Sequence, residues 1–155
     1  MKTESKDSAR ASAREYQTVN TIRCTIMPRD ERDFLVRTLA GLLRQGRPSS
    51  NPNCACRYRG SSGAACAVGL WIPDENYRAA IEGMTVGTVV RNLLPLELCS
   101  IVPEAVMRHV QRIHDVAALP KPINWAAALR DACARLNYGV VFEDAVAFAA
   151  SDAPL

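Results

Sequence analysis

Aromatic residues are scarce in this sequence, at 6% of 155 residues. A surface on which the bases of single-stranded nucleic acid stack needs several exposed rings, so this scarcity disfavours that class of binder. The common nucleotide-binding and hydrolase signatures GxxxxGK[ST], GxGxxG, HExxH and GxSxG are all missing. There is neither an apolar run of the roughly 20 residues that span a membrane nor the apolar segment of a signal peptide. We therefore expect a cytoplasmic protein without a membrane partner.

The composition predicts one globular domain with reduced thiols. The chain is 48% hydrophobic and 23% charged, so it is apolar enough to bury a core. This composition argues against disorder of the whole chain, though not of its ends. Its net charge of +3 tolerates a nucleic-acid partner without indicating one. Because cytosolic thiols stay reduced, the six cysteines are expected to be free or metal-bound rather than paired in disulfides.

Residues 1–20 are predicted to form a flexible arm, and residues 21–150 a single globular domain. The arm has no apolar periodicity and is rich in Ser, Lys, Arg and Glu. Its arginines could contact the phosphates of a nucleic acid, whereas a solvated tail has the same composition. Both interpretations stay open at this point.

The globular part is predicted to be mostly helical, in an α+β fold of four or five helices packed on a small β-hairpin. Capping residues and apolar spacing indicate helices that begin near Asp30, Pro73, Thr85, Pro103 and Asn124. Most of them end at glycine or before proline. A short strand over Ile22–Met27 and one or two helical turns over 144–150 complete the prediction.

The stretch CACRYRGSSGAACAVG, residues 54–69, predicts the hairpin and holds three of the six cysteines. Its GSSG core has the composition of a type I turn with Gly63 in the left-handed conformation. Residues whose numbers sum to 124 then lie opposite each other and alternate between two faces. One face carries Cys54, Cys56, Tyr58 and Cys66, and the other carries Arg57 and Arg59. A two-residue loop would instead place Cys56 and Cys66 on opposite faces.

A zinc site is one use of these cysteines. Structural zinc takes four thiolate or imidazole ligands, and Cys54, Cys56 and Cys66 could supply three of them. The C-x-C spacing lacks the usual second pair of ligands. The alternative is that the cysteines are small buried side chains, as free cysteines usually are. The expectation is therefore no cofactor, with zinc as the alternative.

A nucleophile is another use. Cys66 would attack a substrate, with His114 as the base and Asp115 as the group that orients it, in a cysteine hydrolase or transferase. Adjacent residues of a helix point about 100° apart, which disfavours the orienting role of Asp115. A half-buried His114 that only packs is the alternative.

The two arginines beside the turn form the predicted binding face, together with Tyr58. Paired guanidinium groups suit the phosphates or carboxylates of a partner, and both Arg57 and Arg59 would project from one side of the hairpin. Internal salt bridges are the alternative use of these arginines, with Asp74, Glu75 or Glu82 as the acids.

Two blocks of the sequence, CRYRGSSGAACAVGLWIPDENYRAAIEG and VQRIHD, fit a longer pattern. The pattern runs C-x-Y-R-G-x-x-G-x-x-C-A-x-G-x-L-I-P-D, then Y and E-G, then L-Q-x-I-H-D and a tryptophan helix. The matching residues are Cys56, Tyr58, Arg59, Gly60, Gly63, Cys66, Ala67, Gly69, Ile72, Pro73, Asp74, Tyr77, Glu82, Gly83, Gln111, Ile113, His114, Asp115 and Trp125. Trp71 stands where the pattern has leucine, and Cys54 lies outside it.

In this pattern the chain resembles a family of small uncharacterised proteins of tailed phages and bacterial prophages. The resemblance implies a setting in which accessory proteins bind and inhibit host machinery. We therefore expect a protein that binds a host macromolecule, most simply a bacterial protein. A nucleic acid bound through residues 1–20 is a further expectation.

Overall fold

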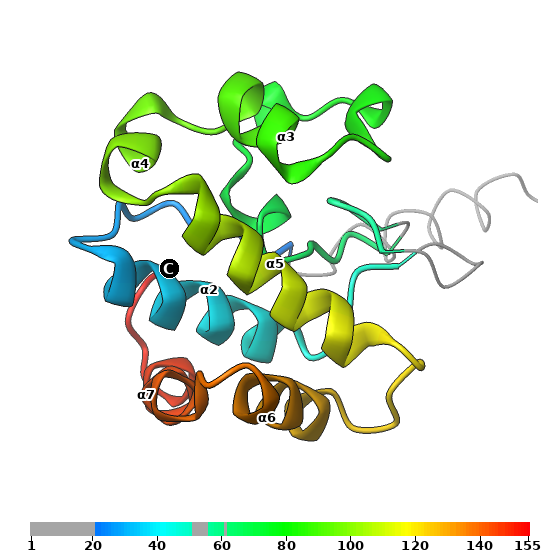
Figure 1. Ribbon diagram of the computed structural model, residues 1–155, viewed down its shortest axis with the longest axis vertical. Coiled ribbons are helices and arrows are strands. Elements are labelled where there is room, and N and C mark those ends of the chain that lie inside the picture. The colour runs from blue at the N-terminus through cyan, green and yellow to red at the C-terminus, as the bar shows by residue number, and fades with distance from the viewer. Residues whose placement is uncertain (1–20, 51–55, 61) are drawn as a thin grey trace, which may run out of the picture.

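The computed structural model of the protein describes residues 21–50, 56–60 and 62–155 (Figure 1). Within them the chain forms a mostly helical single domain with six α-helices and no β-strand. The helices are α2 (Glu31–Gln45), α3 (Val86–Leu93), α4 (Leu96–Ile101), α5 (Glu104–Ala118), α6 (Trp125–Arg135) and α7 (Gly139–Ala150). None of these six helices has the length and apolar character that a membrane span requires. The predicted arm and Cys54 lie outside the described residues.

Helix α2 forms where its capping residues predict it. The side chain of Asp30 accepts a hydrogen bond from the backbone N–H of Asp33, 2.8 Å away, which satisfies an otherwise free donor of the first turn. Gly46 ends the helix at a φ of 74°, a left-handed conformation that glycine adopts without steric cost. Phe34 and Leu42 are buried on its inner face, so α2 lies at the centre of the core.

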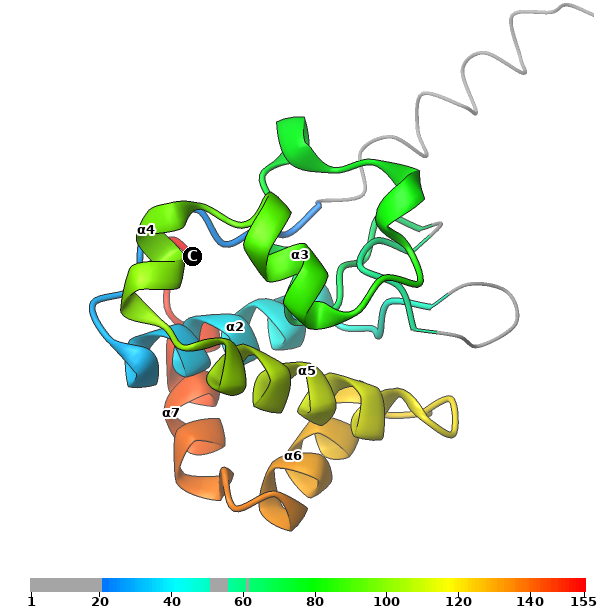
Figure 2. The same ribbon diagram turned by 45° about the horizontal axis from the view of Figure 1, so that its top comes forward.

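The helices close a cycle around this core. Helix α2 packs against α5 and α7, and α6 packs against both α5 and α7. Figures 1 and 2 show α6 and α7 on one side of α5, and α3 and α4 on the other. The indole N–H of Trp125 ties α6 to α2 through a 2.9 Å hydrogen bond to the carbonyl of Leu42.

The predicted hairpin is wrong for the described residues, although its turn and one pair are present. Gly63 has a φ of 81°, and Arg59 pairs with Ala65 in an isolated bridge whose numbers sum to 124. No ladder follows, and Cys56 instead pairs with Ser50. Two backbone hydrogen bonds flank the bridge, from Gly60 to Ala64 at 2.8 Å and from Cys66 to Tyr58 at 3.3 Å. Beyond them the backbone N–H of Tyr58 donates to the side chain of Glu82 instead of to the opposite arm.

Two further predictions are corrected. Residues 22–27 form no strand; the backbone N–H groups of Thr25 and Ile26 both donate to the carbonyl of Leu155. The helix expected near Pro73 is only a pair of 3₁₀ turns, Asp74–Asn76 and Ala79–Ile81. The described residues have six α-helices instead of the predicted four or five. Helix α4 was not predicted, and residues 144–150 belong to the longer helix α7.

Candidate functional site

The segment from Cys56 to Ile72, here called the cysteine segment, is held by side chains rather than by a sheet. The carboxylate of Glu82 accepts hydrogen bonds from two consecutive backbone N–H groups, of Tyr58 at 2.9 Å and of Arg59 at 3.0 Å. The hydroxyl of Tyr77 donates to the same carboxylate at 2.9 Å. Hydrogen bonds to an ionised acceptor are stronger than neutral ones, so Glu82 fixes this part of the segment.

Two glutamines also hydrogen-bond the backbone of the cysteine segment. The side chain of Gln45 accepts from the backbone N–H of Ala65 at 2.7 Å and donates to its carbonyl at 2.9 Å, as a paired strand would. The side chain of Gln111, on α5, accepts from the backbone N–H of Val68 at 3.1 Å. Both polar groups therefore satisfy buried backbone that would otherwise lack a partner.

His114 is fully buried, and both of its ring nitrogens are occupied. The backbone N–H of Ser49 lies 3.2 Å from Nε2, and Nδ1 lies 3.1 Å from Oδ1 of Asp115. A backbone N–H can only donate, so Nε2 is the acceptor and Nδ1 carries the proton donated to Asp115. The hydrogen bonds fix one tautomer of the ring.

The expectation that Asp115 is badly placed for His114 is therefore wrong. Nδ1 is bonded to the ring carbon nearest the backbone, so a carboxylate on the next residue reaches it despite the helical rotation. Gln111 also donates to Oδ1 of Asp115, at 2.8 Å. Burial opposes the charge of Asp115, but hydrogen bonds from His114, Gln111 and the Cys56 thiol outweigh it and lower the pKa of this carboxyl.

Cys56, His114 and Asp115 each bring one possible ligand atom to within 4.8 Å of the other two. Thiolate, imidazole and carboxylate groups are all common zinc ligands. The tautomer of His114 works against this use. A metal on Nδ1 would displace its proton and leave the ring N–H at Nε2, directed at the N–H of Ser49. Two donors would then face each other. The group does not fit a metal while the Ser49 hydrogen bond is in place.

The surroundings of Cys56 and Cys66 disfavour their thiolate forms. Cys66 is buried, and desolvation raises the pKa of its thiol far above the ordinary value. Desolvation and the negative charge of Asp115, to which Cys56 donates its S–H, raise the pKa of Cys56 to about 12. A nucleophilic cysteine needs the opposite shift, so these surroundings work against the predicted role of Cys66 as nucleophile.

The predicted binding residues are largely engaged within the chain. Arg59, with a side chain only 13% exposed, binds the carboxylate of Asp74 at 2.6 Å and lies 4.4 Å from the ring centre of Tyr77. Arg57 approaches Glu82 at 3.7 Å. The hydroxyl of Tyr58 donates to the carbonyl of Met84 at 2.7 Å. Internal salt bridges, the alternative interpretation of these arginines, are thus present.

The cysteine segment lines one wall of a pocket with a volume of about 270 Å³. Cys56, Cys66, Gln111 and Asp115 line it together with residues 82–86. The pocket therefore unites both blocks of the sequence pattern. The polar side chains that line it point mainly at backbone or at each other, which describes a structural network more closely than a reaction centre.

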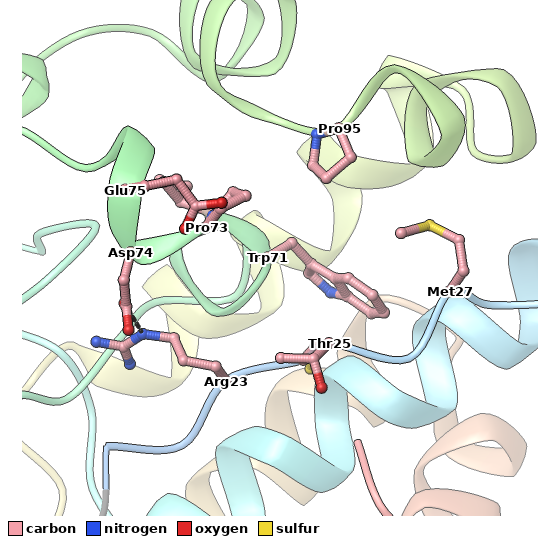
Figure 3. A pocket seen from close by; sticks show the side chains of 10 residues that line it. Arg23, Thr25, Met27, Trp71, Pro73, Asp74, Glu75 and Pro95 are labelled. Carbon is pink, nitrogen blue, oxygen red and sulfur yellow. Dashed lines mark hydrogen bonds and ion pairs between the residues drawn. The ribbon is translucent and has the colours of Figure 1, made fainter.

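A second hollow, here called the groove, lies between residues 23–27, residues 71–75 and Pro95 (Figure 3). It has a volume of about 300 Å³ and a mainly apolar lining that includes Trp71, Met27 and Pro95. Figure 3 shows the side chains of Met27 and Pro95 on two sides of the ring of Trp71, and Asp74 paired to Arg23 at the other end of the groove. The groove thus joins an apolar interior to a charged rim.

The charged rim of the groove presents acids to solvent. Asp74 is 72% exposed and Glu75 is exposed, whereas the side chain of Arg23 is 14% exposed and that of Arg59 13%. The arginines lie beneath the carboxylate of Asp74 and hold its pKa below the usual value against the opposing effect of burial. A partner approaching this end meets the carboxylates of Asp74 and Glu75 before the guanidinium groups.

Sequence reasoning missed the groove and the supporting side chains. The groove draws on three segments that are far apart in the chain, so no local pattern indicates it. Gln45 is an ordinary polar residue at the end of the predicted helix, and Ser49 lies in a predicted loop, so neither carried a signal of its role. Gln111 had one, because it is a polar residue beside the apolar stripe of its helix. Glu82 was part of the pattern, but its use as a backbone acceptor was not predicted.

Comparisons of the chain with protein-family models, with curated proteins and with solved structures find no match.

Proposed function

We propose that this protein is an accessory protein of the phage or prophage type that binds a bacterial host protein and inhibits it. The groove between residues 23–27, residues 71–75 and Pro95 receives an exposed segment of that partner. This moves the predicted binding face from Arg57 and Arg59 to the neighbouring acids and apolar side chains.

The observation that carries the proposal is the pairing of an apolar groove with an exposed acidic rim. Large apolar side chains beside it are also exposed: Leu96, next to Pro95, is 85% exposed, and Ile26, next to Met27, is 41% exposed. Exposed apolar surface around a hollow is typical of protein-binding sites. A partner segment that places an apolar side chain in the groove beside Met27 and Pro95, and a lysine or arginine over Glu75, matches both features.

Catalysis has less support in the described residues. The thiols have raised pKa values, and His114 has no free nitrogen with which to accept a proton. A base must reach the proton that it removes. Binding is therefore the function that the geometry favours over the cysteine hydrolase or transferase.

Photo-crosslinking from the groove tests the proposal. The full chain carries a photoreactive amino acid at Glu75, or at Glu143 on α7 as the control position, and is irradiated in the bacterial host. We expect one host protein to crosslink from position 75 and not from 143. The crosslinked peptide, identified by mass spectrometry, should contain a lysine or arginine close to a large apolar residue.

Two variants decide whether the crosslink reports the groove. Leu96→Ser and Ile26→Ser, which change exposed side chains beside the groove, should each abolish it while the melting temperature stays close to that of the parent chain. Equal crosslinking from both positions, or crosslinking that survives these substitutions, overturns the proposal. A crosslinked nucleic acid in place of a protein does so as well.

A further inference from the structure

The loop between α5 and α6 lies at the end of the molecule opposite the groove and exposes apolar side chains. Its residues 119–123 are here called the knob. In the sequence Leu119-Pro120-Lys121-Pro122-Ile123, the side chain of Ile123 is fully exposed and Leu119 is 53% exposed. Lys121, between them, is exposed as well. Two prolines restrict the backbone of this loop, so little conformational entropy would be lost when it binds.

The knob has the chemistry that the groove selects. The groove offers an apolar interior at Trp71 and Met27 and an exposed carboxylate at Glu75. The knob offers a large apolar side chain at Ile123 and an ammonium group two residues away at Lys121. Apolar burial would supply the affinity, and the opposite charges would set the orientation.

The knob cannot reach the groove of its own chain. Pro95 lines the groove and precedes α4, which leads into the first turn of α5, whereas the knob follows the last turn of α5. The 15 residues of α5 span about 22 Å. Figures 1 and 2 both show the loop beyond α5 at the end opposite α4. A contact between the two must therefore join two molecules.

We propose that the protein self-associates head to tail, with the Leu119–Ile123 knob of one copy seated in the groove of the next. The inference rests on the groove of the proposed function and adds regulation to it, because a second copy competes with the host protein for the same surface. The knob and the groove are different surfaces, so repeated head-to-tail contacts build open chains or rings. A single knob buries less than the about 1,000 Å² of a stable interface, so the association is weak and depends on concentration.

Sedimentation velocity of the full chain, over concentrations up to the solubility limit, measures this association. We expect the average mass of the parent chain to rise with concentration. Ile123→Ser should weaken the association about tenfold or more, since it removes the buried apolar side chain. Val140→Ser is the matched control, because Val140 is also an exposed apolar residue, on α7, and its loss should change nothing.

Charge exchange identifies the two surfaces. Lys121→Glu and Glu75→Lys should each weaken self-association by about three- to tenfold, because each places like charges at the contact. An equal mixture of the two variants should recover the association that each lacks, since every knob then meets a groove of opposite charge. The double variant should recover it alone.

A parent chain that stays monomeric at every concentration overturns the inference. So does self-association that Ile123→Ser leaves unchanged, or a mixture of the charge variants that recovers nothing. These outcomes do not touch the proposed function, because the groove can still crosslink to a host protein while the chain is monomeric. Loss of the host crosslink with self-association intact would reject the proposed function alone.

Discussion

The carboxylate of Glu82 and the backbone N–H of Tyr58 lie 2.9 Å apart, with the N–H donating. Through this contact an acid 24 residues along the chain takes the place that a second strand would have in a hairpin. The N–H of Arg59 and the hydroxyl of Tyr77 complete the set of donors to the same carboxylate. The irregular cysteine segment therefore depends on one side chain for much of its backbone pairing.

Replacing Glu82 with alanine should destabilise the protein strongly. The substitution leaves the N–H groups of Tyr58 and Arg59 without their charged acceptor, which costs about 2–4 kcal/mol of unfolding free energy. Glu143→Ala, which removes an exposed acid 3.6 Å from Arg130, should cost less than about 1 kcal/mol. Urea denaturation of both variants measures the difference. Equal losses would contradict the role assigned to Glu82.

Gly69 should tolerate no side chain. A Cβ on this residue would lie 2.0 Å from the carbonyl oxygen of Tyr58, a backbone atom that cannot rotate away. We expect Gly69→Ala to lower the melting temperature by at least about 10 °C or to prevent folding. Gly139→Ala is the matched control, because nothing lies within 4 Å of its added Cβ. A Gly69→Ala variant as stable as the control would contradict the close approach.

The sequence predicted the helices well and the cysteine segment poorly, for a physical reason. Caps such as Asp30 and Asn124 act on their own neighbours, so the start of a helix can be found from a few adjacent residues. Pairing of the cysteine segment depends on Gln45, Glu82 and Gln111, which act from outside the segment. No local pattern contains that information, so the turn at Gly63 was predicted correctly and the ladder beyond it was not.

The candidate site shows the same division. The sequence pattern named Cys56, His114 and Asp115, and the fold brings these three side chains together. It did not show that Ser49 would occupy the second nitrogen of His114, because that bond joins residues 65 positions apart. The groove at Trp71 could not be predicted either, since its walls come from three separate segments.

The thiols of Cys66 and Cys24 should resist alkylation in the folded protein. Cys66 and Cys24 are buried with pKa values raised by desolvation, so neither forms an appreciable amount of thiolate near neutral pH. We expect iodoacetamide to leave both unmodified until urea unfolds the chain, as measured by mass spectrometry of digested protein. Rapid modification of Cys66 in the folded protein would revive the cysteine nucleophile.

His114 should hold its proton on Nδ1. Nitrogen NMR of the labelled protein distinguishes the two ring nitrogens, and we expect the signature of a protonated Nδ1 and an acceptor Nε2. Added zinc should leave this signature and the melting temperature unchanged, because the Ser49 N–H opposes the tautomer that a metal requires. A stoichiometric shift of both by zinc would show that the Ser49 bond yields to a metal.

Acid should weaken the fold in part through Asp115. Its folded-state pKa lies below the ordinary value of 3.8, because donors from His114, Gln111 and Cys56 outweigh the effect of burial. The unfolded chain therefore takes up this proton at a higher pH than the folded chain. The stability that the carboxylate contributes is complete above its ordinary pKa, and it is lost as the pH falls through the lowered one.

Asp115→Asn should consequently lower the free energy of unfolding near neutral pH, and the difference from the parent chain should shrink on acidification from about pH 5 to about pH 3. Urea denaturation at a series of pH values measures it. Asp152→Asn, at an exposed position, should give a curve parallel to that of the parent. If the Asp115→Asn deficit stays constant over this range, the charge of Asp115 is not what stabilises the folded state.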